Sequence, residues 1–280
     1  MSTLVTGVSG RLGSRFVPRL LAEEEHTRVL VRDAVAGREL RERGTEVVEG
    51  DLRDPNALRR ALEGVDRVVH LAAAFRGVGE DEVVAVNQAA TVNLAHAAVA
   101  AGASRFVFAS TNLVYGQGRG RPARESDPPA PGHAYPQSKA AAEDALRELW
   151  RSENLGLRIL RFAFVYGEGD PHLAESLMWA RTWPAHKRLH LVHHADVGQG
   201  LLRALRAESI DGMTINIADD APVTALELHQ LNGEPVAEDA ANRPLDDPWE
   251  GIVDTTVARA TLGFRPIFPT VYAAKDAGVL

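Results

Sequence analysis

Two side chains able to exchange protons, Tyr135 and Lys139, lie four residues apart in the stretch HAYPQSK (His133–Lys139). On a helix this spacing places both side chains on one face. Pro136 is tolerated only in the first turn of a helix, so we predict a helix that begins near Tyr135. A nearby ammonium favours the phenolate and lowers a tyrosine pKa from its usual value of about 10. Such a pair can take a proton from an alcohol or give one to a carbonyl.

Lysine is rare in this chain. Of the 31 lysine and arginine residues, only Lys139, Lys187 and Lys275 are lysine. A lysine at position 139 therefore indicates a place where a compact ammonium is needed and a planar guanidinium would not fit. The alternative is a surface tyrosine above a solvated lysine.

A third polar group is needed to hold a substrate oxygen, and the stretch FVFASTNLVYG (Phe106–Gly116) offers two hydroxyls. Ser110 and Thr111 stand at the end of an apolar run that we predict to be the fifth strand. Ligands of open parallel sheets bind at the carboxyl ends of the strands. Either hydroxyl could therefore face the substrate.

The stretch TGVSGRLG (Thr6–Gly13) follows the first apolar run and contains Gly7, Gly10 and Gly13 at intervals of three. Glycines let the backbone turn tightly and approach a pyrophosphate, whose charge the helix N-terminus then meets with free N–H groups. A strand before the motif and a helix after it are the context that this interpretation requires. The alternative is a glycine-rich turn that binds nothing.

The choice of dinucleotide depends on the end of the second strand. An acid there would hold a ribose 2′-hydroxyl, but that position is Val31, and Arg32 follows it. With Arg11 expected in the same area, a 2′-phosphate is favoured, and so is NADP over NAD, although Asp33 argues the other way. The alternative for Arg32 is a solvated surface arginine.

Asp51, just past the third strand, is placed to accept a hydrogen bond from the adenine amino group. The alternative for Asp51 is a carboxylate at a helix N-terminus ahead of Pro55.

Apolar runs alternate with helical segments along the first part of the chain. The predicted strands are Thr3–Thr6, Arg28–Val31, Glu46–Glu49, Arg67–Leu71, Arg105–Ala109, Leu157–Phe162 and Met213–Ala218. The predicted helices are Arg11–Glu24, Ala34–Arg43, Pro55–Glu63, Asp81–Ala101, Tyr135–Glu153 and Ala195–Ala207. This rhythm predicts an α/β fold, a doubly wound parallel sheet (Rossmann) with a small C-terminal α/β substrate-binding cap.

We expect residues 1–165 to form the dinucleotide-binding domain, with 190–218 returning to it. Residues 166–189 and 219–280 then form the small substrate-binding region, in which 219–250 is polar and rich in turns.

Composition restricts the classes of partner. The net charge is −7, which argues against nucleic acid, and the absence of cysteine excludes disulfides and thiolate chemistry. The first strand begins at Thr3, leaving no room for a signal peptide, and no apolar run approaches membrane-spanning length. We expect a cytoplasmic protein without a membrane partner.

These pieces together resemble the extended short-chain dehydrogenase/reductase family, the NAD(P)-dependent epimerase/dehydratase group. The resemblance spans nearly the whole chain and rests on TGVSGRLG, GDLRD, HLAA (His70–Ala73), VNQAATVNL (Val86–Leu94), ASTNLVYG, YPQSK, LRFAFVYG (Leu160–Gly167), HADV (His194–Val197) and ATLGFRP (Ala260–Pro266). It implies a nicotinamide cofactor, a small-molecule carbonyl or sugar substrate held by the cap, and a homodimer through the helices Asp81–Ala101 and Tyr135–Glu153.

The resemblance also implies roles for individual residues. Thr111, Tyr135 and Lys139 would form the catalytic triad, with Ser110 as a neighbour and Asn87 as support; a buried helix amide is the alternative for Asn87. Motif and resemblance together predict a cofactor-binding set of Gly7, Ser9, Gly10, Arg11, Leu12, Gly13, Arg32, Asp51, Leu52, Leu71, Ala72, Ala73, Tyr135 and Lys139. The residues expected to face the substrate are Phe75, Asn112, Phe162 and Phe164.

Departures from the family pattern narrow the reaction. Related dehydratases carry an Asp-Glu pair after the threonine, where this chain has Asn112 and Leu113. Sugar-nucleotide enzymes carry an asparagine where this chain has Phe164. We therefore expect a keto-reductase type of oxidoreductase. A sugar-nucleotide 4-epimerase with tightly bound NAD is the alternative, and a non-catalytic dinucleotide sensor is a further one.

Four histidines, His186, His190, His193 and His194, gather in one segment. A metal site is one interpretation, but His186 and His190 flank an extended stretch and no carboxylate set accompanies them. We expect no metal.

Overall fold

Seven parallel strands form the central sheet of the computed structural model, which describes residues 1–23 and 26–280. Their order is β3-β2-β1-β4-β5-β6-β10. The strands are β1 (Ser2–Thr6), β2 (His26–Val31), β3 (Glu46–Glu49), β4 (Arg67–His70), β5 (Arg105–Thr111), β6 (Leu157–Phe162) and β10 (Thr214–Ile217). From β1 the next strands are added toward one edge of the sheet, and from β4 they are added toward the other edge. This switch between β1 and β4 leaves a crevice at their carboxyl ends.

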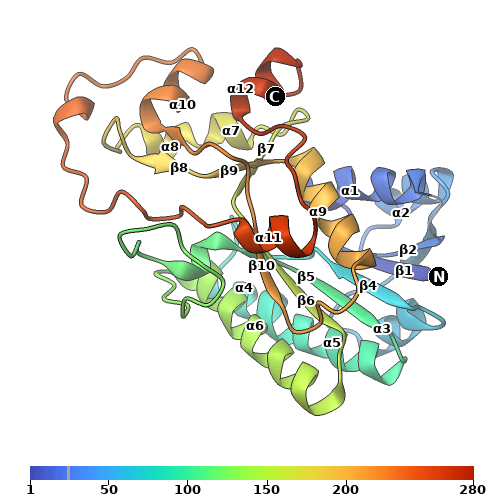
Figure 1. Cartoon of the computed structure of the whole chain (residues 1–280). Helices are drawn as coiled ribbons and strands as arrows, with labels where there is room; N and C mark the ends of the chain where they lie inside the picture. Colours follow the sequence, from blue (N-terminus) through green and yellow to red (C-terminus); the bar gives the residue numbers. More distant parts are fainter. Residues whose placement is uncertain (24–25) are drawn as a thin grey trace.

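Helices cover both faces of this sheet (Figure 1). One apolar core lies under α3 (Pro55–Leu62), α5 (Ala90–Ala100) and α6 (Ala134–Glu153). The other lies under α1 (Arg11–Ala22) and α9 (His194–Arg206), while α2 (Ala34–Glu42) follows β2 at the edge of the sheet. The predicted doubly wound sheet is thus the observed one.

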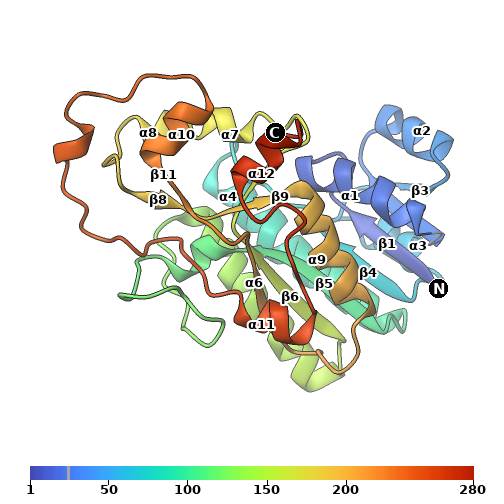
Figure 2. The same cartoon turned by 45° about the horizontal axis from the view of Figure 1, so that its top comes forward.

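The cap is built from short elements grouped above the carboxyl edge of the sheet (Figure 2). Its strands are β7 (Phe164–Tyr166), β8 (Arg188–Leu189), β9 (Leu191–His193) and β11 (Val223–Thr224). Its helices are α7 (His172–Glu175), α8 (Leu177–Ala180), α10 (Ala225–Leu231), η3 (Ala240–Asn242) and α12 (Val271–Asp276). A separate apolar cluster around Tyr166, Leu177 and Val271 holds these elements together.

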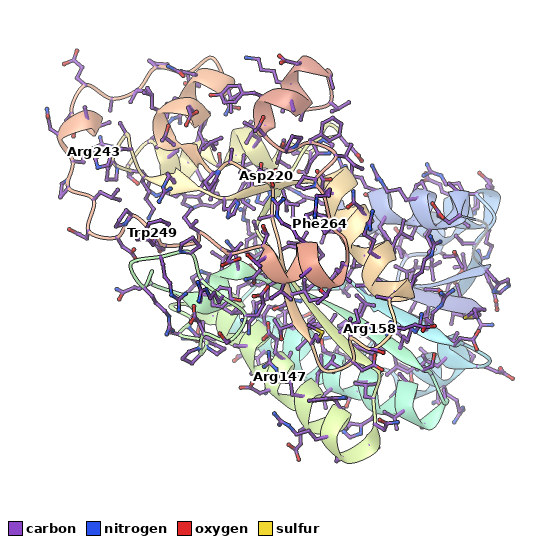
Figure 3. All side chains as sticks on the ribbon, viewed as in Figure 1. Arg147, Arg158, Asp220, Arg243, Trp249 and Phe264 are labelled. Carbon is purple, nitrogen blue, oxygen red and sulfur yellow. The ribbon has the colours of Figure 1, made fainter. Side chains whose placement is uncertain are left out.

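The C-terminal segment does not belong wholly to the cap. Helix α11 (Thr256–Thr261) packs on β10, and Ala258, Leu262 and Phe264 enter the core of the main domain. Figure 3 shows Phe264 beside α11, away from Arg243 on the outer cap segment. The expected assignment of 219–280 to the cap is therefore wrong for residues 256–264. The apolar side chains of this stretch pack against β10 and not against the cap.

Several predicted boundaries shift. Strand β5 continues to Thr111, and α10 forms inside the stretch 219–250 that we expected to be turns. The predicted end of the first helix at Glu24 lies outside the described residues.

The helical run Glu80–Ala100 corrects a further expectation. It combines α4 (Glu80–Val84), a π-helical turn η1 (Ala85–Ala89) and α5. By length and hydropathy this run could span a membrane, so the prediction that no apolar run approaches membrane-spanning length is wrong. Here its Leu94, Ala95 and Ala98 pack into the core beside α3 and α6.

Candidate active site

The glycine-rich turn is shaped by close backbone contacts. Gly7 has a φ of 73°, and a Cβ atom there would lie 2.4 Å from the backbone nitrogen of Ala72. A Cβ on Gly13 would lie 2.3 Å from the carbonyl oxygen of Gly7, so α1 could not pack this closely on the turn after β1 with any larger residue. Gly10 differs, because an added Cβ would meet only the Gly7 oxygen, at 3.2 Å. Gly10 lines the adjoining cleft, so its missing side chain leaves room for a ligand.

This cleft has a volume of about 390 Å³ and lies along the carboxyl ends of β1, β2 and β4. Ten of the predicted cofactor or substrate residues line it: Gly7, Ser9, Gly10, Arg32, Asp51, Leu52, Leu71, Ala72, Ala73 and Phe75. Leu12 is instead turned partly into the core beneath the sheet. The glycine cradle at the N-terminus of α1 and the elongated set of lining residues fit a dinucleotide.

Asp51 is ionised where the cleft reaches the carboxyl end of β3. Its carboxylate accepts hydrogen bonds from the side chain and backbone N–H of Arg53, which hold the pKa of Asp51 down at about 2. The alternative of a helix-capping role is wrong, since Asp54 caps α3 by accepting from Asn56 N at 2.9 Å.

The two arginines expected beside the ribose lie apart. Arg32 is exposed and lines the cleft, while Asp33 uses its carboxylate to cap α2 through Val35 N at 2.8 Å. Arg11 does not join Arg32, contrary to the expectation. Its guanidinium turns toward the cap, where it pairs with Asp170 at 3.0 Å and with Glu175.

The tyrosine–lysine pair stands at the start of α6. The helix begins at Ala134, so Pro136 falls in the first turn, where proline is tolerated. Tyr135 is half-buried and its ring packs against Phe75 of the cleft at a centroid distance of 4.4 Å. Lys139 is 2% exposed, and its Nζ atom lies 4.3 Å from the centroid of the Phe108 ring.

Burial dominates the protonation of both groups. It raises the pKa of Tyr135 to about 12, so the expected lowering of this pKa is wrong for this structure. The physical reason is that a phenolate loses its hydration between packed side chains. Burial also lowers the pKa of Lys139 to about 7, against the opposing charge of Glu143. The neighbouring His70 is neutral, because burial and the charge of Lys139 lower its pKa to about 3.

The two candidate hydroxyls on β5 have different partners. Thr111 Oγ1 accepts a hydrogen bond from Leu113 N at 3.2 Å, which leaves its proton available to a ligand. Ser110 donates at 2.5 Å to Glu143, in a buried cluster behind the strand. Alternate strand residues face opposite sides, so of the two only Thr111 keeps a free donor at the carboxyl edge of the sheet.

Asn87 links three parts of the site from the π-helical turn. Its amide exchanges two hydrogen bonds with the backbone of Ala74, at 2.7 and 2.8 Å, and donates a third to Ser138 Oγ at 3.1 Å. Ser138 in turn donates to the carbonyl oxygen of Tyr135 at 2.7 Å. Asn87 therefore ties the cleft loop to the helix that carries Tyr135. π-Helical turns often occur at functional sites. The sequence pattern of this helix did not indicate one at Ala85–Ala89.

The residues expected to face the substrate separate into two groups. Phe75 lies on the cleft, and Phe164, half-buried, stacks on His172 at 3.9 Å. The prediction is wrong for Phe162, which is 3% exposed inside the main core. It is also wrong for Asn112, whose amide donates to the carbonyl oxygen of Gly251 at 2.7 Å and anchors a loop.

Three of the four clustered histidines are structural. His190 bridges the backbone of Asp219 and Val253, and His193 caps α9. His194 contacts the carboxylate of Asp170 at 2.8 Å, whereas His186 is exposed. Within residues 1–23 and 26–280, no group of three or more histidine or acidic side chains is arranged to hold a metal.

The fold, the glycine cradle and the tyrosine–lysine pair beside it define a dinucleotide-binding protein of the short-chain dehydrogenase/reductase class. The profile of the NAD dependent epimerase/dehydratase family matches residues 3–218. The chain therefore belongs to this family of NAD-dependent enzymes.

Solved structures with bound cofactor resemble the whole chain. A short-chain dehydrogenase/reductase superfamily protein from Agrobacterium tumefaciens, with bound NAD, is 26% identical with a TM-score of 0.81 and covers 99% of this chain and 96% of its own. The UDP-glucose 4-epimerase of Thermus thermophilus in complex with NAD is 28% identical, with a TM-score of 0.79 and coverages of 98% and 97%. DesIV, a dTDP-glucose 4,6-dehydratase of Streptomyces venezuelae with NAD bound, is 26% identical, with a TM-score of 0.79 and coverages of 95% and 92%.

Two curated relatives are longer than this chain. Sterol demethylase protein B of Methylococcus capsulatus is 36% identical over 176 residues, which are 61% of this chain and 53% of that protein. The uncharacterized protein y4nG of Sinorhizobium fredii is 26% identical over 227 residues, 78% and 57% respectively. The chain thus spans little more than half of each.

Proposed function

We propose that this protein is an NADP-preferring oxidoreductase that moves hydride between the nicotinamide and a ketone or secondary alcohol. The observation that carries the proposal is the free donor of Thr111 at the carboxyl edge of the sheet, with Tyr135 and the buried Lys139 on the helix beside it. The NAD bound by similar proteins supports a nicotinamide dinucleotide as cofactor.

Each side chain has a separate task. Thr111 donates a hydrogen bond to the substrate oxygen and fixes its position. The bound nicotinamide, when present, supplies or accepts the hydride. Tyr135 exchanges the proton with the substrate oxygen. Lys139, one helical turn further along α6, supplies positive charge against the burial that disfavours the phenolate.

Tyr135 holds its proton before a carbonyl substrate reacts. With its pKa raised to about 12, Tyr135 carries its proton at neutral pH. A protonated phenol is the form that donates to a carbonyl oxygen as hydride arrives. The oxidation of an alcohol runs this step backwards, so the same poorly hydrated phenolate is formed by reduction and consumed by oxidation. This phenolate is the state that the positive charge of Lys139 has to stabilise in either direction.

The preference for NADP rests on Arg32, which is exposed at the cleft while Asp33 is engaged in capping α2. Arg32→Gln should weaken NADPH binding about tenfold or more and leave NADH binding nearly unchanged, because only the 2′-phosphate is lost as a partner. Titration of both cofactors by fluorescence measures this. Equal effects on the two cofactors would remove the preference from the proposal.

The test of the reaction itself is Tyr135→Phe. We expect the turnover of a ketone panel with NADPH to fall by roughly 10²–10⁴-fold, the range of a lost proton transfer, with unchanged dinucleotide affinity. Tyr272→Phe is the matched control, since Tyr272 is 39% exposed and its hydroxyl donates to Glu227, the one partner it has within residues 1–23 and 26–280. Unchanged turnover in Tyr135→Phe would refute the role of this residue.

A sugar-nucleotide 4-epimerase is the second candidate, favoured by the similarity to the Thermus thermophilus enzyme. Phe164, stacked on His172, stands against it, because the resemblance places an asparagine there in sugar-nucleotide enzymes. Protein purified with stoichiometric NAD and showing no net cofactor oxidation would favour the epimerase.

A further inference from the structure

Arg76 is held on several sides at the rim of the cleft, in the loop that follows β4. Its guanidinium carbon lies 4.7 Å from the ring centroid of Phe75 and 4.6 Å from that of Trp179, so two aromatic faces contact it. Nη1 donates to Glu175 at 2.9 Å, and Nη2 lies 3.0 Å from Nε2 of His172. No motif in the sequence indicated this arrangement.

In its contact with Arg76, His172 is the hydrogen-bond acceptor. Burial lowers the pKa of His172, so its ring is neutral at neutral pH. Its Nδ1 lies 2.8 Å from the carbonyl oxygen of Val165 and must carry the proton to make that contact favourable. Nε2 is then the acceptor for Arg76, and the positive charge of Arg76 meets no repulsion from this ring.

Glu175 is shared by two arginines from different segments. It accepts from Arg76 and, at 2.7 Å, from Arg11 of the glycine-rich turn. Its side chain and that of Arg76 are both 34% exposed, and that of Arg11 is 44% exposed. Ion pairs this accessible to water contribute about 0–1 kcal/mol, so another anion can exchange with the Glu175 carboxylate at low cost.

We propose that Arg76 recognises an anionic group of the substrate, and that Glu175 occupies the position which this group takes. The inference deepens the proposed function by naming a substrate class: a ketone or secondary alcohol that carries a carboxylate or a phosphate. Arg76 lines the cleft, and a guanidinium fixed along one edge is well suited to bidentate binding of an oxyanion.

The distances fit a small substrate. Phe75 contacts both Tyr135 and Arg76, so the guanidinium carbon of Arg76 lies no more than about 9 Å from the Tyr135 ring centroid. A molecule whose anionic group is a few bonds from its carbonyl spans this separation. The opposing interpretation is that the arginine–glutamate contacts only fasten the cap to the main domain.

Binding of simple anions separates the two interpretations without a known substrate. The 280-residue chain is first saturated with NADP and then titrated with inorganic phosphate or acetate by calorimetry at low ionic strength. Saturation keeps phosphate away from the glycine-rich turn, and failure of the protein to bind the dinucleotide would overturn the proposed function itself. Whichever anion binds more tightly identifies the preferred oxyanion.

The variants then give opposite signs. Glu175→Gln removes the competing carboxylate and should tighten anion binding at least fivefold, whereas Arg76→Gln should weaken it at least tenfold. The control is Glu234→Gln, which removes another exposed arginine partner in the cap, 3.4 Å from Arg181, and should change nothing. The inference is overturned if Arg76→Gln binds anions like the wild type, or if Glu175→Gln does not tighten binding.

A matched pair of substrates provides the second measurement. A keto acid and its methyl ester are compared as substrates with NADPH. The wild type should prefer the acid at least tenfold in kcat/KM, and in Arg76→Gln the ratio of acid to ester should fall toward one, mainly through a higher KM for the acid. An ester accepted as well as the acid by the wild type would overturn the inference and leave the oxidoreductase assignment standing.

Discussion

Two buried carboxylates, Glu143 in the main domain and Asp219 at the junction with the cap, have opposite protonation behaviour. Glu143 is 0% exposed and accepts hydrogen bonds from Ser110, Arg161 and Arg147. Asp219 is 1% exposed, and its Oδ1 accepts a long 3.3 Å bond from Ala221 N. Among the described residues, its Oδ2 atom has no hydrogen-bond partner.

The difference shows that partners, and not burial alone, decide the charge of a carboxylate. Burial opposes ionisation at both sites, but the hydrogen bonds and charge of Arg161 lower the pKa of Glu143 below its usual value. Burial raises the pKa of Asp219 to about 8. The nearby His190 does not act as a cation, because burial lowers its own pKa to about 4.

The largest expected effect comes from removing the charge of Glu143. Glu143→Gln leaves the guanidinium groups of Arg161 and Arg147 without their buried counter-ion, so the free energy of unfolding should fall by about 3–5 kcal/mol. Urea unfolding followed by circular dichroism measures it. Asp144→Asn is the matched control, because Asp144 pairs with the same Arg147 at 3.0 Å but is 75% exposed, and it should cost less than about 1 kcal/mol. Similar losses in both variants would refute the distinction.

Asp219 should make stability depend on pH in the opposite sense from an ion-paired acid. Its pKa is about 8 in the folded state and near 3.8 in the unfolded chain, so between these values only the folded state holds the proton. The contribution of Asp219 is therefore complete below about pH 4 and is lost as the pH rises toward 8. The amide in Asp219→Asn has no proton to lose in this range, so the loss should be absent in this variant. At pH 8 the free energy of unfolding of this variant should exceed that of the wild type by roughly a few kcal/mol. Urea unfolding at pH 5 and pH 8 measures the free energy of unfolding of both proteins. The prediction is contradicted if this free energy changes by the same amount between the two pH values in the variant and in the wild type.

Local patterns explain why the fold was largely predictable. The alternation of apolar runs and helices, together with the glycines at 7, 10 and 13, determined the sheet and the position of the cleft. The path of α11 back onto β10 was not predictable, because it depends on which apolar surface remains uncovered after the chain has folded.

The candidate site was predictable where a role follows from backbone position and not where it follows from side-chain direction. Ser9 and Asp51 reach the cleft because they follow strands. Arg11 follows a strand too, yet its long side chain turns to acids in the cap that lie more than 150 residues away. The pKa of Tyr135 likewise depends on Phe75 and other packing that spacing alone does not reveal.

Glu175 offers the smallest expected change and completes the comparison of carboxylates. The hydrogen bond from Arg11 lowers the pKa of Glu175, just as hydrogen bonds from arginine lower the pKa of Glu143. Water, however, reaches Glu175 and both of its arginine partners. Solvent screening should limit the cost of Glu175→Gln to less than about 1 kcal/mol of unfolding free energy, measured under the same conditions as Glu143→Gln. A loss above about 2 kcal/mol would show that the rim contacts fasten the cap to the main domain. It would also contradict the proposed exchange of Glu175 with a substrate anion, since exchange requires that the carboxylate leave its arginines easily.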